Sequence, residues 1–358
     1  MHSFVFDQPA QRVIFGPGAI ASLRDEVARL GARRVVVIST PQEARIAEDA
    51  AARLGDLSAG IYPEVAAQHV PVELLARARE RVRTLGVDAY LAIGGGSTIG
   101  VAKAMALDTG LPIVAVPTTY AGSEMTPIYG ITEGGIKKTG RDRKVLPKTV
   151  IYDANLTLSL PPHISGPSGV NAMAHCVEAL YAQDGNPITS LVAEEGIRAL
   201  ARSLPLVVAQ PDDIDARSDA QYGAWLGGTA LGAVGMSIHH KLCHTLGGSF
   251  NLPHAETHAV ILPHATAYNR EAAPDAMRRI AAALGGVDDA AGGLFDVIQR
   301  IGAPTALKSI GMPADGLDRA AKLATDNPYY SPRPIEYLAV RELLERAFEG
   351  RRPTSAGL

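Results

Sequence analysis

The sequence is poor in cysteine and has no long apolar run, and both shortages narrow what the protein can be. Its 358 residues include only two cysteines, Cys176 and Cys243, too few for a disulfide framework or a zinc site of thiolates. Both are expected to be reduced thiols that pack in the interior. Uncharged stretches such as residues 224–238 are shorter than the about 20 apolar residues of a membrane helix. The first residues lack the pattern of a secretory signal, so we expect a cytoplasmic protein that does not contact membranes.

An excess of charge is also missing. The net charge is -3, and hydrophobic residues make up 47% of the chain against 20% charged residues, the balance of a folded globular protein. A nucleic-acid partner is therefore not expected. The length exceeds what one ordinary core needs, which predicts two domains. We place them at residues 1–155 and 156–358.

The first predicted domain alternates short β-branched runs with amphipathic stretches. This pattern is typical of βαβ units, so it predicts a Rossmann-like α/β domain with a parallel sheet. The expected strands are residues 35–39, 90–93, 113–116 and 149–152, and the expected helices between the first two strands are residues 43–54 and 72–85. Beyond residue 156, Ala- and Leu-rich segments between Pro or Gly predict an all-α domain. Its clearest helices are residues 166–183, 187–206 and 216–232.

A run of three glycines follows the strand predicted at residues 90–93. Gly94, Gly95 and Gly96 are followed by Ser97 and Thr98, and then by a predicted helix at residues 99–107. A strand, a glycine turn and a helix N-terminus together expose backbone N–H groups that suit a pyrophosphate. A plain tight connection between strand and helix is the alternative.

A second polar turn, residues 117–124, follows the next predicted strand and contains Thr118, Thr119 and Ser123. In an open α/β sheet, ligands bind beyond the carboxyl ends of the strands, so the two turns can face one crevice. They predict a dinucleotide site, although neither the G-x-G-x-x-G nor the Walker A spacing is present.

Histidines are concentrated in a short part of the second predicted domain. Five of the ten lie between residues 238 and 259. His240 and His244 share one face of a helix predicted at residues 237–246, and Gly247 and Gly248 are expected to turn the chain so that His254 joins them. His175 lies one helical turn after Asn171. Such inward-facing imidazoles form either a metal site or a site for proton transfer and oxyanion binding.

Ordinary buried histidines at helix ends are the alternative for each of these residues taken singly. His239 and His258 are interpreted as structural. His163 and His264 are placed in loops or at helix starts and receive no role.

With these motifs the chain resembles the iron-containing (group III) alcohol dehydrogenase superfamily and, within it, the maleylacetate reductases. The resemblance runs through residues 15–19, 94–103, 117–124, 156–161, 169–178 and 240–269. It implies the dehydroquinate synthase-like fold, with NAD(P) on the α/β domain and a divalent metal held by one aspartate and three histidines in a cleft. By position these ligands fall on Asn171, His175, His240 and His254, with His244 beside the nicotinamide.

Two positions depart from the superfamily pattern, because Asn171 and Gly100 each stand where an aspartate is usual. Loss of the anionic ligand weakens the site for Fe²⁺ or Zn²⁺. The expectation is therefore a metal-independent enzyme in which the four ligand positions are vestigial. Both departures, and residues 239–244 and 327–330 with Arg333, agree with the maleylacetate reductases.

The resemblance implies reduction of the carbon–carbon double bond of maleylacetate to 3-oxoadipate by NADH or NADPH, in the degradation of aromatic compounds. His175, His240, His244 and His254 are the candidates for stabilising the enolate and delivering the proton; the catalytic set also includes Asn171 and Lys241.

Lys241, Tyr329 and Arg333 are expected to bind the dicarboxylate, although Lys241 could be solvated and Arg333 could only order its loop. A homodimer is expected. The alternatives are a metal-dependent alcohol or polyol dehydrogenase and a non-catalytic nucleotide-binding protein.

The cofactor is expected to contact residues after several strands: Thr40, Gly94, Gly95, Gly96, Ser97, Thr98, Thr118, Thr119, Ser123 and Lys138. Thr40 stands where the superfamily often has an aspartate that selects NAD. An uncharged hydroxyl does not repel a 2′-phosphate, so NADH and NADPH are expected to be used within about tenfold of each other. In the alternative, Thr40 caps the following turn and Glu43 reaches the ribose.

Overall fold

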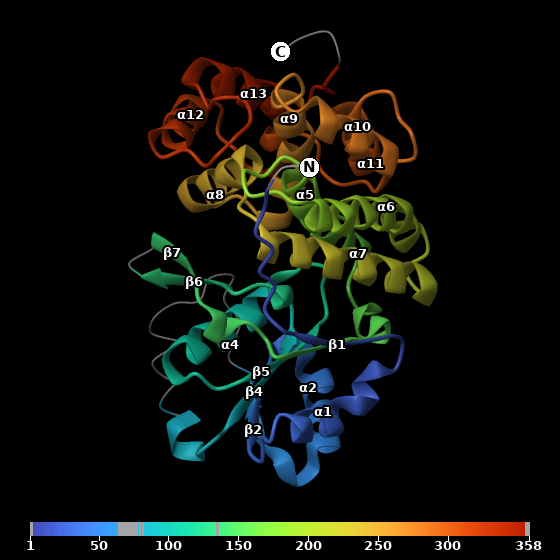
Figure 1. Cartoon of the computed structure of the whole chain (residues 1–358), viewed down its shortest axis with the longest axis vertical. Helices are drawn as coiled ribbons and strands as arrows, with labels where there is room; N and C mark the ends of the chain where they lie inside the picture. Colours follow the sequence, from blue (N-terminus) through green and yellow to red (C-terminus); the bar gives the residue numbers. More distant parts are fainter. Residues whose placement is uncertain (1–2, 64–77, 79, 81, 134–135, 355–358) are drawn as a thin grey trace. The chain divides into compact units, whose positions relative to one another are not determined.

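The computed structural model describes residues 3–63, 78, 80, 82–133 and 136–354. The chain divides into two units. One is Gln8–Leu160, an α/β unit, and the other combines Met1–Asp7 with Pro161–Leu358 and is helical (Figure 1).

A six-stranded parallel sheet is the framework of the α/β unit. Its strands are β1 (Arg12–Phe15), β2 (Val35–Ile38), β3 (Ser58–Tyr62), β4 (Ala89–Gly94), β5 (Ile113–Pro117) and β8 (Thr149–Tyr152). They lie in the order β1-β8-β5-β4-β2-β3, and every neighbouring pair is parallel. Every residue of β2, β4, β5 and β8 is buried, as expected for a parallel sheet covered on both faces.

Helices cover the two faces of this sheet. They are α1 (Leu23–Arg29), α2 (Ala44–Leu54) and α4 (Gly96–Thr109). Successive side chains of a strand point to opposite faces, and β2 shows this directly. Val35 and Val37 belong to the core that includes α1 and α2, whereas Val36 and Ile38 belong to the core that includes α4.

The four predicted strands are confirmed as β2, β4, β5 and β8. The predicted helix at residues 43–54 is confirmed as α2, which follows a short 3-10 turn, η2 (Pro41–Glu43). Most of the helix predicted at residues 72–85 lies outside the described residues. Sequence patterns missed the short strands β1 and β3. They also missed an antiparallel hairpin of β6 (Ile128–Glu133) and β7 (Ile136–Arg141), because its strands contain glycines and charges in place of an apolar alternation.

The helical unit is arranged around one buried helix (Figure 1). Its helices are α5 (Pro162–Ala179), α6 (Pro187–Ala209), α7 (Ile214–Ala233), α8 (Ile238–Phe250), α9 (His254–Tyr268), α10 (Pro274–Ala283), α11 (Ala290–Arg300), α12 (Leu317–Asp326) and α13 (Tyr337–Glu349). The first three confirm the predicted helices at residues 166–183, 187–206 and 216–232. Every residue of α5 from Ser165 to Ala179 is buried, and α5 contacts α6, α7 and α9. A helix that is buried all round has no solvent face to reserve for charge.

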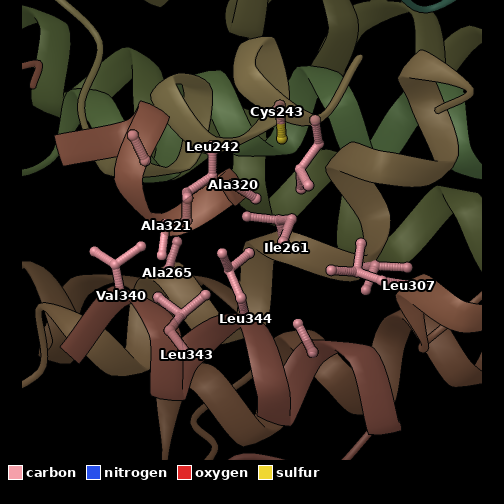
Figure 2. Close-up of a cluster of buried hydrophobic side chains, with 14 of the residues drawn as sticks. Leu242, Cys243, Ile261, Ala265, Leu307, Ala320, Ala321, Val340, Leu343 and Leu344 are labelled. Carbon is pink, nitrogen blue, oxygen red and sulfur yellow. The ribbon is translucent and has the colours of Figure 1, made fainter. Parts of the chain in front are cut away.

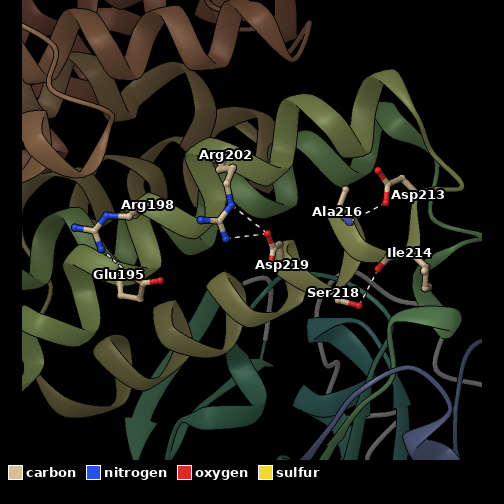
Figure 3. Close-up of polar contacts among 8 residues, drawn as sticks. All are labelled: Glu195, Arg198, Arg202, Asp213, Ile214, Ala216, Ser218 and Asp219. Carbon is tan, nitrogen blue, oxygen red and sulfur yellow. Dashed lines mark hydrogen bonds and ion pairs between the residues drawn. The ribbon is translucent and has the colours of Figure 1, made fainter.

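Polar contacts join α6 and α7 at their surface (Figure 3). Arg202 on α6 donates to Asp219 on α7 over 2.8 Å, and Asp213 caps α7 by accepting from the backbone of Asp215 and Ala216. A second core holds α8, α9, α12 and α13 together, with Leu242, Ile261 and Leu344 among its residues (Figure 2). The structure therefore anchors α8 and α9, which carry most of the histidines, on a large apolar core.

Two local predictions in the helical unit are wrong. Gly247 and Gly248 do not turn the chain, because both lie inside α8. The helix ends instead at Asn251, whose φ of 54° is the left-handed conformation that asparagine tolerates. His264 is not in a loop or at a helix start either, since it lies inside α9 and is 2% exposed. His163 lies in the first turn of α5, as predicted.

Both cysteines are free and buried. Among the residues that the structure describes, no helix combines the length and apolar character that crossing a membrane requires.

Candidate active site

The glycine-rich turn connects β4 to α4. Gly94 ends the strand, Gly95 caps the helix and α4 begins at Gly96, so Ser97 and Thr98 lie in the first turn of a helix that starts three residues earlier than predicted. The first N–H groups of a helix have no intrahelical acceptor and carry the positive end of its dipole. This geometry suits a phosphate group.

The second polar turn packs directly against the first. The N–H of Thr118 donates to the carbonyl of Gly94 over 3.2 Å, and a Cβ placed on Gly95 would lie 3.0 Å from Cγ2 of Thr119. The residues predicted to bind the cofactor on these two turns therefore lie together at the ends of β4 and β5.

Sequence reasoning did not identify Lys103, which holds this second turn in place. Its side chain is fully buried, and Nζ donates to the carbonyl oxygens of Ser123 (2.6 Å), Thr126 (2.7 Å) and Ile128 (2.8 Å). Burial lowers the pKa of Lys103 to about 7, against the opposing effect of the Glu124 carboxylate. The four groups form a buried support for the turn that contains Ser123.

Glu43 connects two of the four threonines predicted to contact the cofactor. Thr40 Oγ1 donates to Glu43 Oε2 over 2.9 Å, and Thr118 Oγ1 donates to Glu43 Oε1. Lys138 lies in β7, opposite Ile131; its side chain is outside what the structure describes.

The four histidines predicted to act together lie in one cluster of the helical unit. The ring of His175 on α5 stacks on that of His240 on α8, with centroids 5.0 Å apart, and the His244 ring lies 6.1 Å from His240. His254 lies at the start of α9 and reaches the cluster by way of His258. The ring of His258 lies 4.4 Å from the ring of His254 and 5.0 Å from that of His240. The sequence thus identified these four residues correctly as neighbours.

The inner side of the cluster is buried. Asn171 and His175 are only 6% and 3% exposed, one helical turn apart on α5. Burial, and then the neighbouring His240, His254 and His244, hold the pKa of His175 well below its ordinary value. His175 is therefore an uncharged imidazole at neutral pH.

Glu178 positions His240, and sequence reasoning missed it. Its fully buried carboxylate accepts from Nδ1 of His240 over 2.7 Å. It also accepts from the backbone N–H groups of Ser237 and His239, each over 2.7 Å, so it caps the start of α8. The sequence does carry a signal that could have identified Glu178. It is the single acidic residue in α5, all of which the structure describes. With its hydrogen on Nδ1, a neutral His240 presents the lone pair of Nε2.

His244 lies at the exposed side of the cluster. Its Nδ1 is 3.1 Å from the hydroxyl of Tyr329, and the ammonium of Lys241 lies 5.8 Å from the centroid of the Tyr329 ring. Partial burial lowers the pKa of Lys241 and raises that of Tyr329. The structure therefore brings together three residues that were predicted to act on the substrate.

Arg333 makes different contacts. Its guanidinium lies over the ring of Tyr268, 4.3 Å from the centroid, and its backbone N–H donates to Asn269 over 3.2 Å. The Tyr268 hydroxyl in turn donates to the carbonyl of Pro334. These contacts order the loop before α13, and a role for Arg333 in binding substrate stays a prediction.

His239 and His258 form a buried pair behind the cluster. Nε2 of His239 and Nδ1 of His258 are 2.9 Å apart and share a hydrogen bond, and Cys243 Sγ lies 3.7 Å from His239 Nε2. Burial keeps the pKa of both imidazoles well below the ordinary value. Their bond to each other leaves the structural interpretation of these two residues in place.

The buried donor atoms of the cluster suit a divalent metal. Asn171 Oδ1, His175 Nδ1 and His240 Nε2 are buried and have no hydrogen-bond partner within the described part of the chain. Imidazole nitrogens and an amide oxygen are ligands that Zn²⁺ or Fe²⁺ accept, and Glu178 behind His240 provides the carboxylate that often supports a histidine ligand.

Comparison with known proteins identifies the wider group. The family model described as iron-containing alcohol dehydrogenase matches residues 10–154, and the C-terminal model of the Fe-containing alcohol dehydrogenase family matches residues 166–348. The chain is 55% identical to a maleylacetate reductase from Burkholderia cepacia, over 99% of this chain and 100% of that one. A maleylacetate reductase from Sphingobium indicum is 54% identical over 99% of both chains. The crystal structure of maleylacetate reductase from Agrobacterium tumefaciens superimposes with a TM-score of 0.95 at 56% identity, covering 99% of this chain and 100% of that one.

The prediction of a metal-independent enzyme is wrong on this evidence, because both family models that cover the chain describe an iron-containing family. The sequence argument counted the carboxylate lost at Asn171. It did not count the Glu178 carboxylate, which contacts His240 from behind and supplies negative charge close to the donor atoms.

Proposed function

We propose that this member of the iron-containing alcohol dehydrogenase family is a maleylacetate reductase that uses NADH or NADPH. The observation that carries the proposal is the full-length similarity to maleylacetate reductases. The substrate is then a small dicarboxylate, and the product is 3-oxoadipate.

The reaction adds a hydride and a proton across a carbon–carbon double bond. Hydride from the reduced nicotinamide attacks the carbon β to the ketone, the double bond shifts, and negative charge develops on the ketone oxygen as an enolate. The enolate then takes a proton at the carbon α to the ketone. The chain must therefore stabilise an oxyanion and deliver one proton.

His244 is the proton donor in this proposal. When the Tyr329 hydroxyl donates to Nδ1 over their 3.1 Å contact, the hydrogen of a neutral His244 is on Nε2. That N–H can protonate the enolate while Nδ1 takes the proton of the Tyr329 hydroxyl, so His244 stays neutral and the partly exposed Tyr329 regains its proton from water.

The buried side of the cluster faces the developing negative charge. Asn171, His175, His240 and His254 would hold a divalent cation, which when bound would supply Lewis-acid polarisation of the ketone oxygen. Glu178 orients the His240 ring through Nδ1. Because His175 is neutral and nearly fully buried, it adds no competing charge and excludes water from this side.

Positive charge is needed for the two carboxylates of the substrate. Lys241 is the first candidate, since it lies beside Tyr329 and is only partly buried. Arg333 is proposed as the second, through a guanidinium that Tyr268 supports. For the cofactor, the N-terminus of α4 with Thr118 and Thr119 is proposed to bind the pyrophosphate.

The test is maleylacetate-dependent oxidation of NADH, with 3-oxoadipate identified as the product. His240→Ala and His244→Ala should each lower kcat by about 10²-fold or more, as expected for groups that act in oxyanion stabilisation or proton transfer. The control is His163→Ala, because His163 is exposed at the start of α5.

Oxidation of alcohols or polyols without reduction of maleylacetate would favour the alcohol dehydrogenase alternative, and binding of NADH without either reaction would favour a non-catalytic protein. A loss below tenfold for either histidine variant would assign that residue to packing. The expected homodimer stays a prediction for light scattering.

A further inference from the structure

Glu43 lies at the carboxyl ends of the central strands, and the proposed function gives it no role. Its carboxylate accepts from Thr40 after β2 and from Thr118 after β5. These hydroxyls arrive from two strands that flank β4 in the sheet. Both oxygens of the carboxylate are therefore held by neutral hydroxyl donors at the carboxyl ends of the strands.

The same carboxylate lies against the end of β4. A Cβ placed on Gly94 would be 2.6 Å from Glu43 Oε2, and Gly94 has a φ of +150°, so a side chain at this position would displace Glu43. Gly94 is the residue before the helix cap at which the pyrophosphate is proposed to bind. Glu43 is thus fixed beside the phosphate turn, on the side of β2.

The arrangement places a negative charge where the ribose next to the adenine is expected. In dinucleotide folds this ribose lies over the strand next to the one that leads into the phosphate turn, and an acidic residue there binds its 2′-OH. Two strands pair with β4, namely β2 and β5. Of these, β2 is the one that the turn with Glu43 follows, and it pairs with β4 from Val35 opposite Ala89 to Ile38 opposite Ala92.

We propose that Glu43 makes the enzyme prefer NADH over NADPH, an inference that rests on the proposed use of a nicotinamide cofactor. The carboxylate would accept hydrogen bonds from the ribose hydroxyls in exchange for those from the threonines. A 2′-phosphate at the same place would bring like charges together, which weakens the binding of NADPH. Thr40 then orients Glu43 and does not contact the phosphate itself. This replaces the expectation, based on Thr40 alone, that both cofactors are used similarly.

The experiment compares NADH with NADPH in two ways. Steady-state kinetics with maleylacetate give the ratio of kcat/KM for the two cofactors, and quenching of protein fluorescence gives the Kd of each without any substrate. The native protein should prefer NADH by more than about tenfold, and Glu43→Gln should reduce that preference by at least about tenfold, mainly by tightening NADPH.

Two further variants distinguish the effect of Glu43 from a general effect of charge and from a direct role of Thr40. Glu48→Gln makes the same change of charge at an exposed position of α2 and should leave the ratio within about twofold. Thr40→Val should weaken NADH slightly and leave NADPH weak. If Thr40 itself binds the 2′-phosphate, Thr40→Val instead loses NADPH, which overturns the proposal.

An unchanged ratio in Glu43→Gln, or a native ratio within tenfold, also overturns it. The binding measurement can support the role of Glu43 even if the proposed reaction is wrong. If maleylacetate is not reduced but Glu43→Gln still shifts the ratio of the two Kd values, the proposed reaction is wrong and the role of Glu43 stands.

Discussion

The cofactor turn and the histidine cluster are built from different parts of the chain. At the turn, the groups proposed to bind the cofactor are backbone N–H groups of α4, and Gly94 and Gly95 leave space where a Cβ would collide with Glu43, Thr98 or Thr119. In the cluster, the binding groups are side chains, and a buried carboxylate holds one of them. The first kind of site tolerates replacement of most side chains; the second depends on each partner remaining in place.

The two glutamates differ in the same way. Glu43 is only half-buried and is held by hydroxyls, so water can replace its partners at little cost. Glu178 is fully buried and accepts three hydrogen bonds, so loss of its charge leaves buried donors without an acceptor. The comparison predicts that function is lost selectively at the turn, whereas function and stability are lost together at the cluster.

The largest expected effect is therefore that of Glu178→Gln. An amide cannot accept from Ser237, His239 and His240 together, and its own N–H groups would face donors. The free energy of unfolding should fall by about 4 kcal/mol, and kcat should fall because the His240 ring is no longer fixed. Urea denaturation measures the first effect and steady-state kinetics the second.

Glu195→Gln is the matched control, since Glu195 pairs with Arg198 on the surface of α6 (Figure 3). Surface pairs contribute at most about 1 kcal/mol. Equal losses in the two variants would break the contrast between the buried and the exposed carboxylate. Glu178→Asp separates positioning from stability: a variant that stays destabilised but regains part of kcat at unchanged KM would show that the carboxylate positions His240 as well as stabilising α8.

The backbone of the glycine turn could be predicted more completely than the contacts of the histidine cluster. The turn is formed by consecutive residues, whereas the cluster depends on side chains far apart in the chain. Glycines after a buried strand and before a helix predict a turn at a helix N-terminus, so the places of Gly94, Gly95 and Gly96 could be assigned locally. The histidine spacing on α8 was also local. Glu178 was not, because its partners Ser237 and His239 are about 60 positions away in the chain.

Other errors also came from long-range packing. Gly247 and Gly248 suggested a turn by their local conformational freedom, but the core of α8 and α9 keeps the helix intact up to Asn251. The edge strands β1 and β3 are only partly buried and lack a continuous apolar run. Pairing with β8 and β2 makes them strands.

A second prediction tests whether a histidine buried away from the cluster makes the stability of the protein sensitive to acid. Burial, with a smaller effect of Arg346, lowers the pKa of His264 to about 4. The unfolded chain binds a proton on this imidazole below its ordinary pKa of 6.5, but the folded chain does so only near pH 4, so stability falls as the pH falls between these values. The loss should reach about 3 kcal/mol.

Urea denaturation from pH 7 to pH 4 measures this loss as the difference between the native protein and His264→Gln. The variant should lose less stability across the range while keeping kcat at pH 7. The exposed His163, replaced in the same way, should leave the slope unchanged. Parallel curves for the native protein and His264→Gln would show that His264 is protonated in the folded state, and a fall in kcat would place it in the site.

The smallest expected effect is that of Asn171→Asp. It tests whether this one residue changes the affinity of the cluster for a divalent metal. Asn171→Asp replaces an amide nitrogen by an oxygen and adds the negative charge that a divalent cation prefers. The affinity for Zn²⁺, measured by competition with a chromophoric chelator, should therefore rise at least about tenfold, equivalent to about 1.4 kcal/mol. His175→Ala should weaken binding in both backgrounds, because it removes a buried donor that has no hydrogen-bond partner among the described residues. Asn186→Asp is the control for charge alone, since Asn186 is also buried but caps α6 through its side-chain oxygen, which an aspartate retains. An unchanged affinity in Asn171→Asp would remove Asn171 from the ligand set and leave a metal at this site to the histidines alone.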